Sequence, residues 1–460
     1  MAKVLEFARD WIRFDQRWFF LFYVLAGIPY LVLTGPFRSP DERNHFLRSY
    51  EISELRSHPF RPSGGFVGDN LPSSLSRLSE ALDDHSENHI RPAQIALARS
   101  LRLDPQKREF AECPMVLYSP VAYLASSVSI AIGRMFGAGP LALVYFARAG
   151  NLLVVAWLIS LALAHAGFAR PAALIVALFP MTLAQVASVS ADAMTYGISF
   201  LWVALVLELA VGSKVELSRK RIFLLIGLAL VLSGLRPPYP LLGLLVFLIP
   251  LRCFGGKFAI LVCSAVALAS LLPSVLWNVS VAELYVKPAV EQNIDPQTQL
   301  QWVAKHPGVF WHRVKQDFYR NWFEYWDELV GRLGWLNIRL PFWIVLGFAV
   351  ALVACTGIGS RAPPSLVWWQ RCALGLTILV GIVAIEFSQY LSFNPIRSAF
   401  ILGIQGRYFV PFAFVAVFAV SSSFLRRAPF DLLCKLGCSL FVVSAHVGVY
   451  FTLARAAGKI

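Results

Sequence analysis

The feature that most constrains this chain is a series of long apolar stretches that recur from residue 18 to residue 453. A helix needs about 20 apolar residues to cross a hydrocarbon layer, and in lipid only helices and closed barrels satisfy the backbone hydrogen bonds. The stretches cover residues 18–35, 118–137, 141–164, 172–188, 191–211, 222–235, 240–251, 257–277, 341–359, 372–391, 408–424 and 430–453. Charged residues make up only 15% of the chain, against about 25% in ordinary globular domains, which excludes a water-soluble globule. We therefore predict a single all-α polytopic membrane domain over residues 1–460.

Two polar loops, 36–117 and 278–340, interrupt the apolar stretches. In the first loop we expect short amphipathic helices near residues 41–56 and 92–103. In the second loop, aromatic residues recur at helical spacing among basic residues from about 306 to 330. Such a composition is typical of a helix that lies on the membrane surface.

Basic residues decide the predicted orientation, because lysine and arginine near short loops stay on the cytoplasmic side. The basic N-terminus is therefore expected inside and loop 36–117 outside. The other basic clusters, which all favour the inside, are Lys214 with Arg219–Arg221, Arg252 with Lys257, Arg361 with Arg371, and Arg426 with Arg427. The pattern is consistent if the serine-rich stretch 118–137 lies at the interface or re-enters. We therefore predict about 11 spans, or about 12 if this stretch crosses, with both polar loops on one outer face.

Asp41 and Glu42 follow the first apolar stretch closely enough to lie at the edge of the hydrocarbon. Partial desolvation there makes a carboxylate a stronger base, usable in general base catalysis. The alternative is structural: Ser39 or Asp41 would cap a short interfacial helix with acids in its first turn. Both interpretations are compatible. Helical spacing would bring His45 and Arg48 to the same acids, for a structural hydrogen bond or for catalysis.

Arg236, beside two prolines, and Arg407, between Gly406 and Tyr408, are basic residues at the outer boundary. A guanidinium group matches phosphate oxygens with paired hydrogen bonds and offsets the charge that develops on a leaving group. Both arginines therefore suit a donor whose leaving group is a lipid phosphate. The alternative is that they only snorkel to lipid headgroups.

Other polar residues carry weaker signals. Glu208 and Glu386 lie inside apolar stretches, where ionisable groups are costly and often functional. The string Asp83–His89 contains potential metal ligands, but its spacing implies no third ligand, so we interpret it as a solvated acidic turn and predict no metal site. The chain carries no Walker motif, no G-x-S-x-G and no dinucleotide fingerprint, which leaves coupling to ATP unsupported.

A family resemblance is visible in the first loop, where the chain reads Asp41-Glu42-x-x-His45-Phe46-x-Arg48-x-Tyr50. This string resembles the first-loop signature of a bacterial family of polytopic membrane proteins of unknown function. Further matching pieces, which span most of the chain, are Tyr118-Ser119-Pro120 with Tyr123, Phe179-Pro180-Met181-Thr182 with Ser188–Asp192, Arg236-Pro237-Pro238-Tyr239, Leu333-Gly334-Trp335-Leu336 and Gln405-Gly406-Arg407-Tyr408-Phe409. The chain departs from the pattern at Arg236, where lysine is frequent, and residues 57–112 match nothing. That family is in turn similar in layout to the GT-C glycosyltransferases, which use polyprenyl-phosphate sugars and keep an acidic residue in the first outer loop.

The resemblance implies a GT-C-like helix arrangement and a membrane glycosyltransferase on the extracytoplasmic face of the bacterial cytoplasmic (inner) membrane. The enzyme would transfer a sugar from a polyprenyl-phosphate donor to an envelope glycan or lipid acceptor, in contact with membrane lipids and without nucleic acid. Asp41 would be the base, with Glu42 supporting it or exchanging roles. Asp192 would orient the acceptor or bind a cation, unless it only caps the helix 193–211. The residues expected to bind substrate are His45, Arg48, Asp192, Arg236, Tyr239, Arg407 and Tyr408. No cofactor is implied, although such enzymes vary in their need for a divalent cation.

Two other classes of function remain open. A transporter or flippase of lipid-linked sugars predicts inverted repeats and charged residues near the bilayer midplane, whereas the polar motifs here gather at one face. A noncatalytic assembly subunit predicts outer acids buried in salt bridges with no cavity beside them. A groove of lipid size that opens sideways next to Asp41 would favour the enzyme.

Overall fold

The computed structural model describes residues 15–56, 60–62, 66–82, 89–212, 216–255, 258–285, 293–357, 366–422 and 430–459. Within these ranges, six helices are long and apolar enough to cross a membrane: α2 (Gln16–Leu33), α7 (Pro140–His165), α10 (Ala191–Gly212), α12 (Ala259–Ser280), α16 (Trp368–Ser392) and α18 (Phe430–Ala456). A seventh span results if the pair Gly167–Ala177 and Pro180–Val186, bent by 76°, is one broken helix. The helical membrane protein predicted from the sequence is therefore present, with six or seven candidate spans.

The remaining apolar stretches form helices that are shorter than a span. They are α11 (Arg219–Ser233), η4 (Tyr239–Leu248), α15 (Phe342–Gly357), and η8 (Gly406–Phe409) followed by α17 (Val410–Val420). Proline explains several of these short elements, because it removes a backbone donor and is tolerated in the first turn of a helix. Pro237 and Pro238 separate α11 from η4, and Pro411 lies in the first turn of α17.

The stretch 118–137 also fails to form a long helix. It folds as η2 (Pro120–Tyr123) and the 12-residue helix α6 (Leu124–Met135). A helix of this length is about 18 Å long, too short to cross the hydrocarbon. α6 packs against α3 (Glu42–Ser53) and α7. This placement agrees with an interfacial or re-entrant segment.

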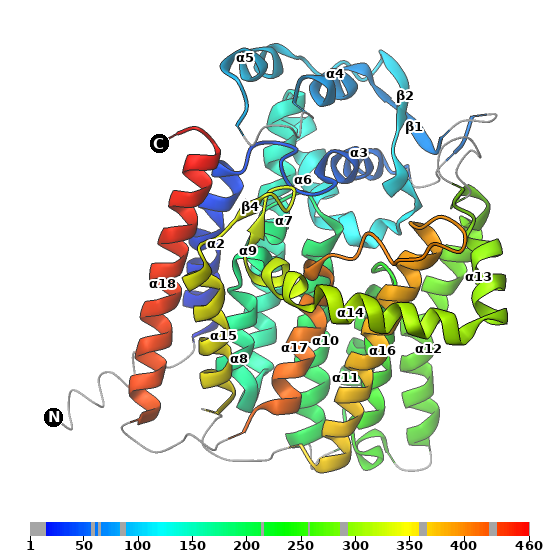
Figure 1. The fold of residues 1–460 in the computed structure, drawn as a ribbon, viewed down its shortest axis with the longest axis vertical. Helices are drawn as coiled ribbons and strands as arrows, with labels where there is room; N and C mark the ends of the chain where they lie inside the picture. Colours follow the sequence, from blue (N-terminus) through cyan, green and yellow to red (C-terminus); the bar gives the residue numbers. More distant parts are fainter. Residues whose placement is uncertain are drawn as a thin grey trace.

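The described part of loop 36–117 forms a compact head at one end of the bundle (Figure 1). α3 and α5 (Pro92–Ser100) confirm the two helices expected there. β1 (Gly68–Pro72) and α4 (Ser73–Leu82) lie between these two helices in the chain, and β2 (Arg108–Glu112), which pairs antiparallel with β1, follows α5 and precedes η1 (Pro114–Leu117). The head has its own apolar core, which includes Phe37, Phe46, Leu47, Tyr50, Leu75 and Leu78.

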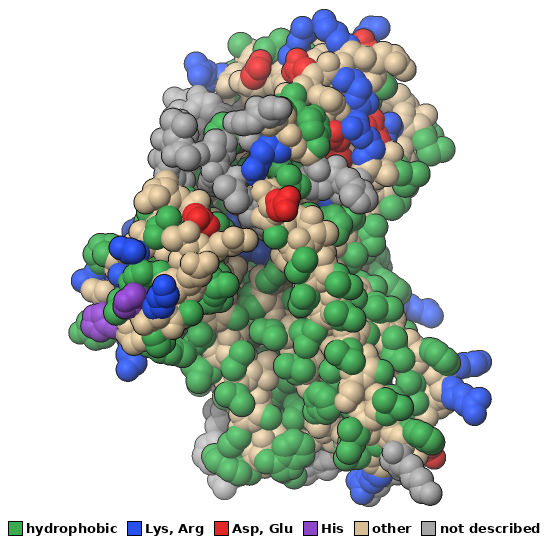
Figure 2. All heavy atoms as spheres, turned by 90° about the vertical axis from the view of Figure 1, so that its right-hand side faces the viewer, with side chains coloured by type: hydrophobic (Ala, Val, Ile, Leu, Met, Phe, Trp, Pro, Cys, Tyr) green, Lys and Arg blue, Asp and Glu red, His purple; other side chains and the backbone are tan. Residues whose placement is uncertain are grey.

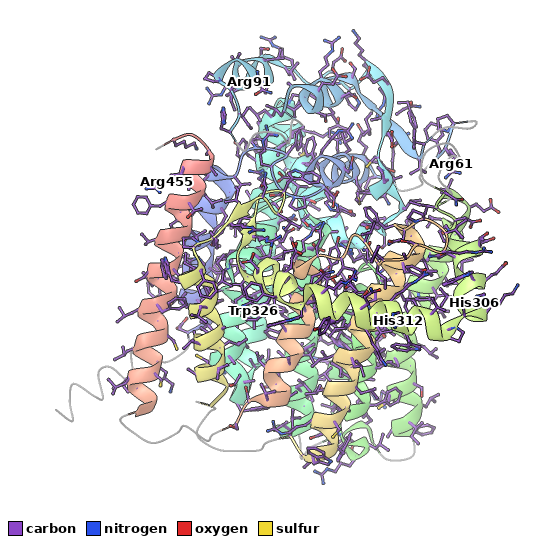
Figure 3. The ribbon with its side chains drawn as sticks, viewed as in Figure 1. Arg61, Arg91, His306, His312, Trp326 and Arg455 are labelled. Atoms are coloured by element: carbon purple, nitrogen blue, oxygen red, sulfur yellow. The ribbon has the colours of Figure 1, made fainter. Side chains whose placement is uncertain are left out.

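The second polar loop contributes α13 (Pro296–Lys305) and α14 (Pro307–Val330), and α14 lies across the bundle in Figure 1. A short hairpin of β3 (Arg332–Leu333) and β4 (Ile338–Arg339) follows. The helix expected from about 306 to 330 is confirmed. It turns Phe310 and Val314 inward and leaves Trp311 and Trp322 exposed, and Figure 3 shows His306 at the periphery, where α13 meets α14. This amphipathic pattern suits a helix at a membrane surface.

The basic loops meet at the end of the bundle opposite the head. Leu217 donates to the carbonyl of Cys253, next to Arg252, and Arg371 donates to the carbonyl of Ser421. Figure 2 shows charged side chains on the head, a largely hydrophobic flank beneath it and further basic side chains near the far end. The two ends of the bundle therefore differ as the sequence predicts. Some residues on which the predicted orientation and the acidic-turn interpretation depend lie outside the described residues. They are residues 1–14, 83–88, Lys214, Lys257, Arg361, Arg426 and Arg427.

The centre of the bundle is formed by α7 and α10, of which 67% and 72% of the spanning window is buried. The corresponding share for α16 and α18 is 22%, so these helices lie at the periphery with apolar faces that suit lipid contact. α2 packs against both α7 and α18. α10, the more buried of the two central spans, begins at the end of the bundle that carries the head.

Candidate functional site

Two acids and two arginines from distant parts of the chain form an alternating charge cluster below the head. Asp41 Oδ2 lies 3.2 Å from Arg407 Nη2, and Arg407 Nη1 lies 3.2 Å from Asp192 Oδ2. Asp192 Oδ1 in turn lies 3.2 Å from Arg236 Nη1. The structure thus brings together four residues that the sequence analysis expects at one site. Asp41, Arg407, Asp192 and Arg236 form the charge cluster.

Asp41 enters the cluster because its side chain does not cap the helix it precedes. It occupies the N-cap position of α3 with φ 60°, in the left-handed region, and makes no capping hydrogen bond through its side chain. Its backbone carbonyl accepts the first helical bond from His45 N. The interpretation of Asp41 as a side-chain cap is therefore wrong. Aspartate tolerates this backbone conformation, and the carboxylate, 33% exposed, is directed to Arg407.

Asp192 lies in the first turn of α10 and is buried. Its backbone N–H donates to Ser190 Oγ at 3.1 Å, so Ser190 performs the capping that the sequence left open for Asp192. The Asp192 carboxylate is thereby left to bridge the two arginines. A buried charge is tolerated only when it is paired in this way, which makes Asp192 the centre of the cluster.

Arg407 is buried and held on several sides. Its Nε donates to Gln405 Oε1 at 2.6 Å and its Nη1 to Gln185 Oε1 at 3.2 Å, while Tyr196 Oη donates to its carbonyl at 2.8 Å. The turn that carries it is fixed to α14, because Gly406 N donates to Glu328 Oε2 at 2.7 Å. Arg407 is therefore placed by contacts that leave its guanidinium little freedom to move.

Gly406→Ala should move this turn. A Cβ at position 406 would lie 2.7 Å from Glu328 Cβ, 2.6 Å from Leu329 N and in still closer contact with the carbonyl of Tyr325. Overpacking of this kind costs about 1–3 kcal/mol. We expect a lower unfolding temperature in detergent and weaker activity of any reaction that uses Arg407. Gly375→Ala is the matched control, since a Cβ there meets nothing within 4 Å; equal stability of the two variants would contradict the prediction.

The ring of Tyr408 lies between the two arginines. Arg236 Cζ is 4.4 Å from its centroid and Arg407 Cζ is 5.3 Å away, and Arg236 also lies 5.7 Å from the ring of Tyr118. A cation over an aromatic face is stabilised by the ring quadrupole. Tyr239 Oη fixes the turn by donating to the Tyr408 carbonyl at 2.9 Å. Tyr239 and Tyr408 are thus brought to the cluster as expected, and both help to position it.

A pocket of about 230 Å³ lies beside Arg236. Its lining comes from the η1–η2 region, α11 with the residues after it, and α12: Leu117, Tyr118, Ser119, Val121, Leu230, Ser233, Gly234, Leu235, Arg236, Pro237, Pro273, Ser274, Trp277 and Asn278. One lining residue, Leu230, is also exposed on the surface of α11. Arg236, whose side chain is 11% exposed, belongs to both the pocket and the cluster. Asp41 does not line this pocket.

Glu42 is placed differently from its neighbour. It is completely buried, with Oε1 accepting from Arg148 Nε at 2.7 Å and Val189 N at 3.0 Å, and Oε2 accepting from Arg148 Nη2 at 2.6 Å and Phe37 N at 2.9 Å. Both oxygens are therefore fully engaged. This geometry does not support a catalytic role for Glu42 and gives it a structural one beneath Asp41.

Arg148 is the residue that sequence reasoning missed. Its remaining N–H groups donate to the carbonyls of Leu31, Thr34 and Gly35 at 2.7–2.8 Å, which closes the end of α2. One guanidinium group thus joins α2, α7 and the start of α3. The signal was present, since Arg148 is a charged residue inside the apolar stretch 141–164, where such groups are rare and have a purpose.

His45 and Arg48 hold the head together. His45 is buried with Nδ1 2.8 Å from Tyr123 Oη, and burial lowers the pKa of His45 to about 4, so its ring is neutral at pH 7. Arg48 donates to Glu51 Oε2 and to the Tyr118 carbonyl, each at 2.8 Å. The expected approach of Arg48 to the acids at positions 41 and 42 is replaced by these contacts. Among the described residues, no three His, Cys, Asp or Glu side chains gather as a metal site.

Comparison with protein families identifies the family of the chain. A family model described as "Predicted membrane protein (DUF2142)" matches residues 22–416, a range that includes all four residues of the charge cluster. No curated protein matches the chain significantly, and no solved structure does so either.

Proposed function

From the premise that the chain belongs to this family of predicted membrane proteins, we propose that it is a glycosyltransferase of the GT-C type. It would act on the extracytoplasmic face of the bacterial cytoplasmic membrane and transfer a sugar from a polyprenyl-phosphate donor to an envelope glycan or lipid. The N-terminus would be cytoplasmic, and the short apolar helices would complete a total of about 11 crossings in a GT-C-like arrangement.

The observation that carries this proposal is the charge cluster with a pocket at one side. The cluster has a partly exposed carboxylate, Asp41, at one end and an arginine, Arg236, at the other. The pocket beside Arg236 is lined largely by apolar side chains, and one of them, Leu230, is also exposed on the surface of the bundle. A phosphate on a long lipid tail matches this combination, because the arginine suits the phosphate and the apolar flank suits the tail.

In the proposed reaction, Asp41 accepts the proton of an acceptor hydroxyl as its oxygen attacks C1 of the sugar. The bond between C1 and the phosphate oxygen breaks, and its electron pair leaves with the lipid phosphate. Attack on the face opposite the leaving group inverts the configuration at C1. Arg236 and Arg407 offset the charge that develops on the phosphate, and Asp192 keeps the two guanidinium groups in place.

Arg236→Gln tests the donor side of the proposal. A hydrogen bond to a charged group contributes about 1.5–3 kcal/mol, so we expect kcat/KM for the lipid-linked sugar to fall about 10- to 100-fold. Arg236→Lys should recover part of this loss, because it keeps the charge without the paired donors. The measurement is transfer of labelled sugar from a synthetic polyprenyl-phosphate donor to envelope fractions by membranes that contain the protein.

The exposed Arg102 provides the control, and Arg102→Gln should leave the transfer rate unchanged. Wild-type kinetics of Arg236→Gln towards the donor would contradict the proposed phosphate site. Movement of the labelled donor across vesicle membranes without release of its sugar would instead favour transport of lipid-linked sugars.

A further inference from the structure

A second group of acids is buried where α14 crosses α16, apart from the charge cluster. Asp317 on α14 accepts from Asn321 Nδ2 at 2.9 Å and from Tyr325 Oη at 2.5 Å. Glu386 on α16 is the neighbouring ionisable group that acts on Asp317, and α14 packs on α16 here through Phe310, whose ring centroid lies 5.6 Å from that of Phe387 and 5.7 Å from that of Tyr390. Both acids are buried, and Glu386 has no exposed surface.

The carboxyl group of Glu386 is buried without a hydrogen-bond donor among the residues that the structure describes. Within the described part of the chain, neither of its oxygens has a hydrogen-bond donor, and the polar group in front of it, the Asp317 carboxylate, is itself an acceptor. Two acceptors cannot bond to each other unless one carries a hydrogen, and a buried unpaired carboxylate is strongly disfavoured. The contact therefore requires either a proton or a cation between the two groups.

His312, Lys315, Tyr319 and Arg320 of α14 are exposed to solvent, and the following titratable side chains around α14 and α16 have partners of their own. They are Arg332 with Asp327 and Glu324, Glu328 with Gly406, Arg407 with Asp41 and Asp192, Arg313 with Tyr390, Tyr239 with the Tyr408 carbonyl, Arg371 with the Ser421 carbonyl, and His306 stacked on Trp302. The groups that bear on the acid pair are thus Tyr325 and Asn321, neither of which supplies a positive charge.

We propose that Asp317 and Glu386 form a proton-binding site in which Glu386 carries one proton and donates it to the ionised Asp317. Asp317 then accepts three hydrogen bonds, from Asn321, Tyr325 and Glu386, which compensate its single charge. Burial raises the pKa of Asp317, and burial together with Asp317 raises the pKa of Tyr325, so that the phenol remains a donor. Glu386, inside the span α16, remains neutral.

The site is connected to the turn that carries Arg407. Tyr325, whose hydroxyl binds Asp317, contacts Phe409 of η8 with ring centroids 5.5 Å apart. One turn further along α14, Glu328 holds Gly406 N. Loss of the shared proton would set two carboxylates against each other and push α14 away from α16. The protonation state of the pair therefore acts on the turn that precedes and follows Arg407, whatever reaction the charge cluster performs.

Infrared spectroscopy of the full-length protein tests the proton directly. At pH 7 the wild-type protein should show the carbonyl stretch of a protonated buried carboxyl group, and Glu386→Gln should remove that band. Asp317→Asn, which leaves Glu386 protonated beside an amide acceptor, should keep the band at a shifted frequency. Absence of any such band in the wild-type protein, or its presence only after sodium is removed, would overturn the proposal; the second result would assign the site to a cation.

Thermal unfolding in detergent gives a second readout. The folded protein holds a proton that the unfolded chain releases above roughly pH 4.3. Stability therefore falls as pH rises, by up to about tenfold in the folding equilibrium per pH unit, until the folded state also loses the proton. The amide introduced by Glu386→Gln supplies an N–H donor at every pH, so this variant should lack the pH-dependent component, whereas the exposed Glu109→Gln should keep it. Parallel pH profiles of wild type and Glu386→Gln would reject the site.

Discussion

Asp41→Asn should slow sugar transfer by about 10²–10⁴-fold and leave the protein folded. Asparagine keeps a side-chain oxygen that can receive a hydrogen bond from Arg407 Nη2, which lies 3.2 Å from the carboxylate of Asp41. The amide is too weak a base to take the proton of the sugar-accepting hydroxyl. General base catalysis contributes about 10²–10⁴-fold to rate, and we expect a loss in that range. Arg407 stays paired with Asp192, so the charge cluster keeps most of its structure.

The decisive measurement is the rate of transfer by membranes matched for protein level. Asp104→Asn, at an exposed acid of the same head, is the control and should behave as wild type. Asp41→Asn should also bind the lipid-linked donor with unchanged affinity, because the phosphate contacts are assigned to the arginines. A variant that transfers sugar at the wild-type rate would remove Asp41 from the mechanism.

Glu42→Gln should instead lower stability strongly. Removing one partner of a buried ion pair costs about 3–5 kcal/mol, since the other charge is left uncompensated. Arg148 would remain fully buried with its hydrogen bonds to three carbonyls but without a carboxylate. Arg148→Met should lower stability by a comparable amount. It leaves the buried carboxylate of Glu42 without its positive partner and removes the hydrogen bonds that hold the end of α2.

Unfolding temperature and yield in detergent are the measurements for this pair. Glu208→Gln is the control, since Glu208 is 49% exposed and its contact with His165 is of the surface kind, worth about 0–1 kcal/mol. Arg148→Lys should be intermediate, because lysine keeps the charge but has fewer donors. If Glu42→Gln were fully stable yet inactive, Glu42 would regain the catalytic role that its contacts do not support.

The sequence was sufficient to predict that Asp41 and Arg407 meet. Asp41 follows the apolar stretch 18–35, Arg407 precedes the stretch 408–424, and both residues are predicted on the same side of the membrane. It could not separate Asp41 from Glu42. The two are adjacent in the chain, but the left-handed backbone of Asp41 turns one carboxylate towards the cluster, while Glu42 begins α3 and is directed to Arg148. That difference depends on the tertiary position of Arg148, which no local pattern encodes.

The number of spans was harder to predict than the class of fold. Apolar composition identifies a segment that can be buried, but it does not fix whether that segment forms one straight helix. The stretch 172–188 shows the difficulty: Pro180 begins a new helix, and the segment bends by 76°. The sequence does not reveal the partner of Glu386 either, since Asp317 lies on an amphipathic helix and its pattern does not distinguish the acid that is buried from those that face water.

The separation of 366 residues between Asp41 and Arg407 has a consequence for biosynthesis. Chains grow at about 5–20 residues per second, so roughly 20–70 s pass between the synthesis of the two residues. Glu42 meets Arg148 after only 106 residues, so the anchor beneath Asp41 can assemble early while its partner does not yet exist. A nascent chain that stalls before η8 would therefore be able to form the Glu42–Arg148 ion pair, but it would lack Arg407 and so the complete charge cluster.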